Sequence, residues 1–238
     1  MSKQKILIIV PAYNEGRNIK ATIEGILSLR LGAAILVVDD GSRDQTSSEA
    51  VQTQVKVIAL PFNLGIGGAV QTGFQYAREH DFDIAVQVDA DGQHDVSYLG
   101  KLIDPVLNRR ADMTIGSRFL PPYLGYRSSW VRRMGIHFFA RLISFLTKSK
   151  VTDPTSGFRA FNKKMIHAFA EYYPHDFPEP EAIMVARRLG AQILEVPVQM
   201  RKRTHGQSSI RYVRTLYYMV KVTCAILLSM IKKKEIVD

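Results

Sequence analysis

The chain has 238 residues, 46% of them apolar, which excludes an intrinsically disordered protein and suits one compact domain. A single cysteine, Cys224, excludes an internal disulfide and favours a reducing compartment. The net charge of +10 is unevenly placed, because residues 113–152 and 196–234 contain no Asp or Glu and hold 16 of the 32 cations. These segments predict an anionic partner: a phosphorylated substrate, a phospholipid surface or nucleic acid.

Apolar runs of strand length alternate with helical patterns in the first half of the chain. Strands are expected at residues 6–11, 34–38, 55–60, 84–88 and 113–115. Helices are expected at residues 18–29, 46–51, 67–80 and 96–108. This alternation predicts an α/β fold with a mostly parallel sheet flanked by helices. Ligands in such folds bind beyond the carboxyl ends of the strands, so the site is expected at that edge.

The second half is less regular. It predicts a helix over residues 130–148, a turn-rich loop over 152–159, a strand over 192–196 and a long helix over 210–234. We therefore expect a catalytic domain over residues 1–209 and a basic amphipathic helix within residues 210–238. No run reaches the ~18 apolar residues of a membrane span.

Two carboxylates, Asp89 and Asp91, directly follow the expected strand at residues 84–88. Acids two residues apart in such a turn can reach one point, and their oxygens suit a hard cation such as Mg²⁺ or Mn²⁺. The cation would neutralise a diphosphate leaving group. A solvated turn also contains such residues, but their position at the end of a buried strand favours a metal site.

Polar side chains also follow the first two strands. Tyr13 offers a ring that can cover a nucleobase, and Glu15 can accept hydrogen bonds from a ribose or base. An ordinary loop before a helix would explain both, since a helix dipole favours an acid in the first turn. Asp40, at the end of the second strand, can bind a base or ribose.

Four strand ends together carry a family resemblance. They read Pro-Ala-Tyr-Asn-Glu, Asp-Asp-Gly-Ser, Asn-Leu-Gly-Ile-Gly-Gly-Ala and Asp-Ala-Asp-Gly-Gln-His. In this order and spacing they resemble the family 2 glycosyltransferases with the GT-A fold, and more closely the dolichyl-phosphate mannosyltransferases and polyprenyl-phosphate glycosyltransferases. The resemblance covers roughly residues 5–210. It implies a nucleotide diphosphate sugar, a UDP- or GDP-hexose, as the donor.

The resemblance also implies roles for residues on the donor side. The nucleoside would be held by Pro11, Tyr13, Glu15, Val38 and Asp40. Asp89 and Ala90 would contact nucleotide or sugar. Asp91 and Gln93, with Asp89, would ligate the metal.

Arg118, which the resemblance also places among the nucleotide-sugar-binding residues, would face phosphate, since a guanidinium matches phosphate geometry. Arg132 falls near the place of another anion-binding cation, with Arg133 as the alternative. Asp153 would orient the acceptor, act as a base or cap its turn. A phosphate acceptor is already ionised and needs little help from a base.

Two further positions complete the expected site. Glu181 would bind the donor sugar or the acceptor. Arg203 lies in the segment 201–209, which resembles a loop that closes over the donor and excludes water. A lysine common in the mannosyltransferases is absent here, with Ser209 near its place, and this puts mannose in doubt.

The expected helix at residues 210–234 has an apolar patch with cations at both ends. We expect it to lie in the bilayer interface, although a core or oligomer contact would also explain it. The helix around Phe138, Phe139, Leu142, Ile143 and Phe145 is a candidate for the same surface. The protein is then peripheral on the cytoplasmic face of a membrane. A separate membrane protein or a second copy of the chain remains open as a partner.

The resemblance implies an inverting, metal-dependent hexosyltransferase. It would transfer sugar to polyprenyl phosphate, such as undecaprenyl or dolichyl phosphate, and feed cell-surface polysaccharide or protein glycosylation. The alternative is transfer to a hydroxyl of a growing glycan. A nucleic-acid-binding protein is suggested only by charge and lacks a helix-turn-helix, zinc-ligand spacing or an aromatic stripe, so no nucleic-acid partner is expected. A non-catalytic sugar-nucleotide binder is disfavoured by the intact acidic motif.

Overall fold

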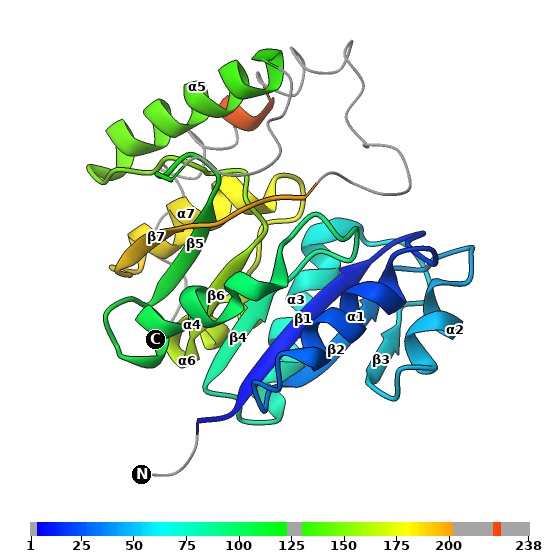
Figure 1. Cartoon of the computed structure of the whole chain (residues 1–238). Helices are drawn as coiled ribbons and strands as arrows, with labels where there is room; N and C mark the ends of the chain where they lie inside the picture. Colours follow the sequence, from blue (N-terminus) through cyan, green and yellow to red (C-terminus); the bar gives the residue numbers. More distant parts are fainter. Residues whose placement is uncertain (1–3, 123–129, 202–220, 225–238) are drawn as a thin grey trace.

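A computed structural model describes residues 4–122, 130–201 and 221–224 and confirms the α/β fold (Figure 1). Seven strands form one sheet in the order β3-β2-β1-β4-β6-β5-β7. They are β1 (Ile6–Ala12), β2 (Ala34–Asp39), β3 (Lys56–Ala59), β4 (Ile84–Gln87), β5 (Met113–Ser117), β6 (Arg159–Asn162) and β7 (Ile193–Pro197). Among these strands, β6 runs antiparallel to its neighbours β4 and β5, and the other pairs are parallel.

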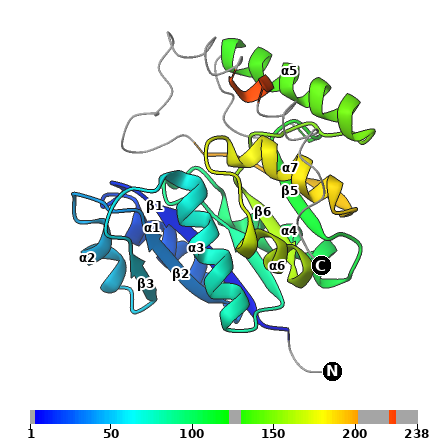
Figure 2. The ribbon, with the colours of Figure 1, turned by 180° about the vertical axis from the view of Figure 1, so that it is seen from behind.

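Helices cover both faces of the sheet (Figures 1 and 2). They are α1 (Ile19–Ser28), α2 (Thr46–Val51), α3 (Gly65–Glu79), the 3₁₀ turn η1 (Val96–Tyr98), α4 (Leu99–Leu107), α5 (Trp130–Thr147), α6 (Lys163–Glu171) and α7 (Pro178–Arg188). The alternation of side chains along β1 separates the two cores, because successive residues point to opposite faces. Leu7 and Ile9 join the cluster that includes α3, α6 and α7, whereas Ile8 and Val10 join the cluster that includes α1 and α4.

The strand order reverses between β1 and β4. β1 pairs on one side with β2, which continues to β3, and on the other side with β4. Parallel sheets bind ligands at the carboxyl edge of such a reversal. Since β6 is antiparallel, it begins at that edge: Arg159, its first residue, pairs with Gln87 at the end of β4. The loop that precedes β6 therefore lies beside the loop that follows β4.

The expected elements of the first half are confirmed with shifts of one or two residues at their ends. The expected helix at residues 96–108 begins as η1 and continues as α4. Sequence reasoning missed β6, α6 and α7. Most of the helix expected over residues 210–234 lies outside the described residues. Residues 221–224 are helical, and Val222 is fully buried in the cluster that includes Phe139 and Ile143 of α5. Phe139 and Ile143 were expected to join a lipid-facing surface, and this expectation was wrong because their side chains fill the core beneath the helix.

No helix among the described residues combines the length and apolarity that crossing a membrane requires.

Candidate active site

The loop after β4 places both predicted metal-binding carboxylates at the carboxyl edge of the sheet. Asp89 and Asp91 are partly exposed, and an Asp91 oxygen accepts a hydrogen bond from the Gln93 backbone N–H at 3.0 Å. Asp89 accepts a hydrogen bond from Gln87 Nε2 at 3.3 Å. The turn after β4 therefore contains three side chains with oxygen atoms that can bind a metal ion: Asp89, Asp91 and Gln93.

His94 fixes the shape of this loop. Its ring is buried, stacks on Phe158 with 4.8 Å between ring centroids, and accepts a hydrogen bond at Nδ1 from the Asp89 backbone N–H at 3.1 Å. This contact leaves the proton on Nε2, which lies 3.5 Å from an Asp89 carboxylate oxygen. His94 thus orients Asp89 from within the protein.

Gly157 lets the loop before β6 approach Asp89 closely. A Cβ at this position would lie 2.9 Å from both Asp89 carboxylate oxygens and 3.0 Å from Gln87 Nε2. Only a residue without a side chain allows this approach. The Asp153–Phe158 segment therefore forms one wall of the site.

The residues predicted to hold the nucleoside lie at the ends of β1 and β2 and in the loops that follow them. Pro11, Val38 and Ala90 are buried, whereas Tyr13 is 45% exposed and its ring is accessible. The backbone N–H of Glu15 donates to Thr46 Oγ1 at 2.8 Å, and its carboxylate accepts from Asn18 Nδ2 at 2.7 Å.

Asp40 is buried, and its carboxylate accepts a hydrogen bond from the Leu64 backbone N–H at 2.7 Å. Burial raises the pKa of Asp40, although backbone N–H donors at the start of α3 partly oppose this. Asp40 therefore links the end of β2 to α3, next to the surface on which Tyr13 lies.

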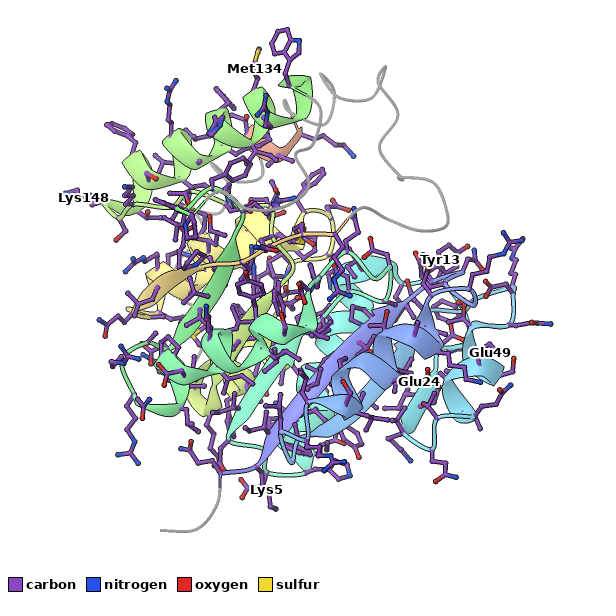
Figure 3. All side chains as sticks on the ribbon, viewed as in Figure 1. Lys5, Tyr13, Glu24, Glu49, Met134 and Lys148 are labelled. Carbon is purple, nitrogen blue, oxygen red and sulfur yellow. The ribbon has the colours of Figure 1, made fainter. Side chains whose placement is uncertain are left out.

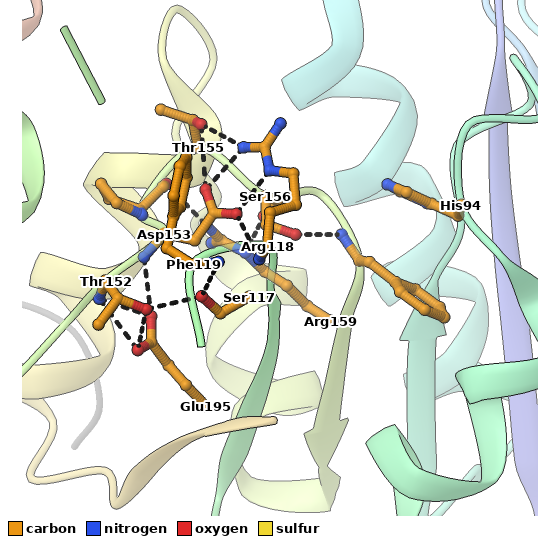
Figure 4. Close-up of polar contacts among 12 residues, drawn as sticks. His94, Ser117, Arg118, Phe119, Thr152, Asp153, Thr155, Ser156, Arg159 and Glu195 are labelled. Carbon is orange, nitrogen blue, oxygen red and sulfur yellow. Dashed lines mark hydrogen bonds and ion pairs between the residues drawn. The ribbon is translucent and has the colours of Figure 1, made fainter. Parts of the chain in front are cut away.

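Arg118 and Asp153 form a two-point ion pair on the other side of the site (Figure 4). Arg118 Nε and Nη2 each lie 2.6 Å from a different oxygen of Asp153, and Nη2 also donates to Thr155 Oγ1 at 2.7 Å. Burial alone would lower the pKa of Arg118, but the charge and hydrogen bonds of Asp153 raise it overall. The guanidinium is thus held firmly, with its charge intact.

Glu195 on β7 holds the backbone of the loop that contains Asp153. Its carboxylate accepts hydrogen bonds from the backbone N–H groups of Thr152 and Asp153 at 2.8–2.9 Å and from Thr152 Oγ1 at 2.7 Å (Figure 4). Burial raises the pKa of Glu195. The backbone of Asp153 is therefore fixed as firmly as its side chain.

Sequence reasoning missed a buried charge beneath the site. Arg159 is fully buried, donates to the carbonyl oxygens of Ser156 and Pro154 at 2.6 and 3.0 Å, and within the described chain its Nη1 has no hydrogen-bond partner. Burial lowers the pKa of Arg159. Its contacts hold the same loop that contains Asp153 and Gly157.

Glu179, in the first turn of α7, is the second group that was missed. Burial raises its pKa, and the charges of Arg159, Asp89 and Arg118 also act on it. It therefore lies within electrostatic reach of Asp89 on one side of the site and Arg118 on the other. The predicted residue Glu181 lies two positions further along α7 and is half-buried. The side chain of Arg132 and all of Arg203 lie outside the described residues.

The donor groups at Asp89, Asp91 and Gln93 fit a hard divalent cation. Among the described residues, no three His, Cys, Asp or Glu side chains form a closed metal cage. An open set of two carboxylates and an amide oxygen is what Mg²⁺ uses when substrate phosphates supply its other ligands. The residues present therefore suit a cation that is bound together with a diphosphate.

Comparison with known proteins identifies the family. Residues 7–169 match the family model described as Glycosyl transferase family 2. The UDP-N-acetylglucosamine–dolichyl-phosphate N-acetylglucosaminyltransferase of Methanococcus voltae is 33% identical over 218 residues, which cover 84% of this chain and 86% of that protein. The undecaprenyl-phosphate mannosyltransferase of Micrococcus luteus is 31% identical, with 87% of each chain covered.

The fold has a solved counterpart in glucosyl-3-phosphoglycerate synthase from Mycobacterium tuberculosis, crystallised with Mn²⁺, UDP and glucosyl-3-phosphoglycerate. The TM-score is 0.72 at 22% identity, with 96% of this chain and 80% of that chain covered. This likeness supports the GT-A architecture. From the family model and the sequence relatives, the chain belongs to glycosyl transferase family 2 and is a glycosyltransferase.

Proposed function

We propose that this enzyme transfers a hexose from a nucleotide diphosphate sugar to a polyprenyl phosphate at the cytoplasmic face of a membrane. The observation that carries the proposal is the placement of opposite charges around one point. Asp89 and Asp91 lie after β4, and Arg118 lies after β5 within the electrostatic reach of Asp89. Two relatives that are 33% and 31% identical are named as transferases that act on dolichyl and undecaprenyl phosphate.

On the donor side, Asp89, Asp91 and Gln93 would hold Mg²⁺ or Mn²⁺, which would offset negative charge on the diphosphate as it leaves. Tyr13 would cover the base, and Glu15 and Asp40 would accept hydrogen bonds from the nucleoside. The Asp89–Gly157 approach leaves no room for a side chain between the two loops, so the donor's sugar would be confined beside Asp89.

On the acceptor side, Arg118 would bind the lipid phosphate. Its hydrogen bonds to Asp153 and Thr155 use Nε and Nη2, so Nη1 would be the nitrogen that donates to a phosphate oxygen. That oxygen attacks the anomeric carbon while the bond from this carbon to the diphosphate breaks, which inverts the configuration. No proton leaves the acceptor, so Asp153 would position Arg118 and would not act as a base.

Transfer to a sugar hydroxyl is the second candidate, and Glu179 favours it. A hydroxyl must lose its proton, and a carboxylate whose pKa lies above its ordinary value is a stronger base for this step. Burial raises the pKa of Glu179. The two candidate functions therefore differ in the acceptor, and only transfer to a hydroxyl requires Glu179 to act as a general base.

The test measures labelled sugar that enters the lipid phase when purified enzyme is incubated with Mn²⁺, polyprenyl phosphate and one of several UDP- or GDP-hexoses. The proposal expects transfer from one donor, lost in Asp91→Ala and kept in the matched variant Asp104→Ala. Asp104 is an exposed carboxylate on α4 that pairs with Arg110. No transfer to lipid from any donor, with transfer to a glycan oligosaccharide instead, would overturn the lipid acceptor in favour of the hydroxyl.

A further inference from the structure

One short loop, from Asp153 to Phe158, touches both halves of the site. Asp153 and Thr155 accept hydrogen bonds of 2.6–2.7 Å from Arg118. Gly157 lies against Asp89, where an added Cβ would come within 2.9 Å of both carboxylate oxygens. Only three residues separate Asp153 from Gly157, so the path of this loop sets where Arg118 lies relative to Asp89.

The loop lies at the carboxyl edge of the sheet. Figure 3 shows Lys5 and Tyr13 at opposite ends of β1, and Tyr13 marks the carboxyl end. β6 begins at this edge with Arg159, which pairs with Gln87 at the end of β4 and with Ile115 of β5. Arg159 therefore directly follows the loop, and its own backbone is fixed in the sheet.

The side chain of Arg159 reaches back to the loop. Its Nε donates to the Ser156 carbonyl oxygen at 2.6 Å, and its Nη2 donates to the Pro154 carbonyl oxygen at 3.0 Å. The loop's own bonds at Ser156 are longer: its N–H lies 3.4 Å from the Asp153 carbonyl oxygen, and its Oγ lies 3.3 Å from the Phe158 N–H. Hydrogen bonds from a cation are also stronger than bonds between neutral groups. Arg159 is therefore the main anchor of the middle of the loop.

This anchor is costly for the fold. Arg159 is fully buried, and within the described chain its Nη1 has no hydrogen-bond partner. Negative charges at Glu179, Asp153 and Asp89 act on it from nearby. Burying a charge and an unpaired donor costs free energy, and an apolar side chain could fill such a position without this cost. General stability therefore does not explain an arginine here, whereas its hold on the loop does.

We propose that Arg159 is a positioning residue for sugar transfer: by fixing this loop, it sets the distance between a donor at Asp89 and an acceptor phosphate at Arg118. The reacting oxygen and the anomeric carbon must lie about 3–3.5 Å apart and in line, and a displacement of about 1 Å can cost 10²-fold in rate. The inference rests on the proposed function, which places the donor and the acceptor at these two residues. Because Arg159 is fully buried, it acts through the loop and not by touching a substrate.

The test compares transfer with hydrolysis of the same donor by the same enzyme. In hydrolysis, a water oxygen bonds to the anomeric carbon, the diphosphate leaves with the electron pair of its bond to this carbon, and one proton of the water passes to solvent. This reaction needs the donor side of the site but not Arg118. Each variant is incubated with Mn²⁺, undecaprenyl phosphate and each of several UDP- and GDP-hexoses, and labelled sugar is measured in the lipid phase and as free sugar.

Arg159→Met keeps a long side chain but removes the guanidinium. We expect the ratio of transfer to hydrolysis to fall roughly 10- to 100-fold, with a much smaller change in hydrolysis itself. The ratio does not depend on the fraction of enzyme that is folded, so a loss of stability alone would not move it. Arg159→Lys keeps the charge but cannot reproduce the planar two-point contact, so its ratio should fall less.

Arg187→Met is the matched control. Arg187, in the last turn of α7, also donates to a loop carbonyl oxygen, that of Ala191, at 3.2 Å. Its Nε is likewise buried without a hydrogen-bond partner in the part of the chain that the structure describes. Its ratio of transfer to hydrolysis should equal that of wild type.

Hydrogen exchange of the free enzyme gives a second readout that needs no substrate. Arg159→Met should speed exchange most at the backbone N–H groups of Ser156 and Phe158, and less in β1. A general loss of stability would instead speed exchange throughout the sheet. Arg187→Met should leave exchange in the loop unchanged.

Wild-type ratios in Arg159→Met and Arg159→Lys would overturn the proposal. So would a lower ratio without faster exchange in the loop, because Arg159 would then act by another route. If Arg159→Met does not fold, Arg159→Lys decides by the same two measurements. A failure of the proposed function is distinguishable: wild type would transfer sugar to a glycan oligosaccharide and not to lipid phosphate, and the ratio would then be measured with the oligosaccharide.

Discussion

Arg118 donates a hydrogen bond to each carboxylate oxygen of Asp153. Asp153 is fully buried, and its backbone N–H donates to the carboxylate of Glu195. A carboxylate in this setting has no free oxygen facing outward to collect a proton. Its effect is to fix the plane of the guanidinium, and a fixed guanidinium can recognise phosphate without losing conformational freedom on binding. This geometry supports the proposal that Arg118, held by Asp153, binds the acceptor phosphate.

Arg118→Lys should separate charge from geometry. Lysine keeps the positive charge but cannot form the planar two-point contact with Asp153. We expect the KM for polyprenyl phosphate to rise roughly tenfold, which corresponds to about 1.4 kcal/mol, with a smaller change in the KM for the donor. Steady-state kinetics with each substrate varied in turn would measure this. Arg110→Lys is the control, because Arg110 lies just after α4 and forms an exposed ion pair with Asp104. An equal rise in both KM values would contradict a specific role at the acceptor.

Asp91→Asn should weaken metal-dependent transfer by roughly 10²–10³-fold, because it removes one charged ligand from an open set of oxygen donors. The measurement is initial rate against Mn²⁺ concentration. The variant should require more Mn²⁺ for half-maximal rate and should keep a wild-type melting temperature, since Asp91 is partly exposed. Asp104→Asn should match wild type in both measurements. A variant with unchanged Mn²⁺ dependence would remove Asp91 from the metal site.

The regular part of the fold could be predicted because its signal is local. β1 is buried from Leu7 to Ala12, and its uninterrupted apolar run is visible in the sequence. β6 has only four residues and begins with Arg159, a residue type that predicts exposure. Its burial depends on the carbonyl oxygens of Pro154 and Ser156, contacts that form only in the folded loop. No pattern in the sequence predicts hydrogen bonds between a buried arginine and backbone carbonyl oxygens of a loop.

Part of the candidate site could be predicted from sequence motifs, and part could not. Motifs at the strand ends placed Asp89, Asp91 and Arg118 at one edge of the sheet, where the structure has them. The sequence analysis named Glu181 and missed Glu179, and residues two apart on a helix are about 200° apart around its axis, so the two side chains face different surroundings. In the folded protein the charge of Asp89 acts on Glu179. The individual roles of these residues remain predictions.

Gly157→Ala should impair activity more than stability. The added Cβ would meet both Asp89 oxygens at 2.9 Å, so Asp89 must move, and small displacements of catalytic groups cost up to about 10²-fold in rate. Gly100→Ala is the matched control, because nothing lies within 4 Å of its Cβ and alanine favours its helix. We expect kcat to fall roughly 10- to 100-fold in Gly157→Ala and to stay unchanged in Gly100→Ala. Equal activity in both variants would show that Asp89 has room to move.

Glu179→Gln should change how stability depends on pH. Burial raises the pKa of Glu179 above its usual 4.5, so the folded protein holds this proton more tightly than the unfolded chain does. The resulting contribution to stability is fully present below pH 4.5 and is lost as pH rises through the folded-state pKa. Glutamine does not titrate, so the variant should lose less stability than wild type over this rise.

Urea unfolding between pH 4 and pH 8 would measure this difference as a gap in unfolding free energy that widens with pH. Glu181→Gln removes the same charge from the first turn of α7 and serves as the control for the helix dipole. The part of the effect that belongs to Glu179 is the difference between the two variants. If the curves of both variants run parallel at every pH, the Glu179 carboxylate is as easily ionised in the folded protein as in the unfolded chain. In that case it would be a poor candidate for the general base that a hydroxyl acceptor requires, and the phosphate acceptor would gain support.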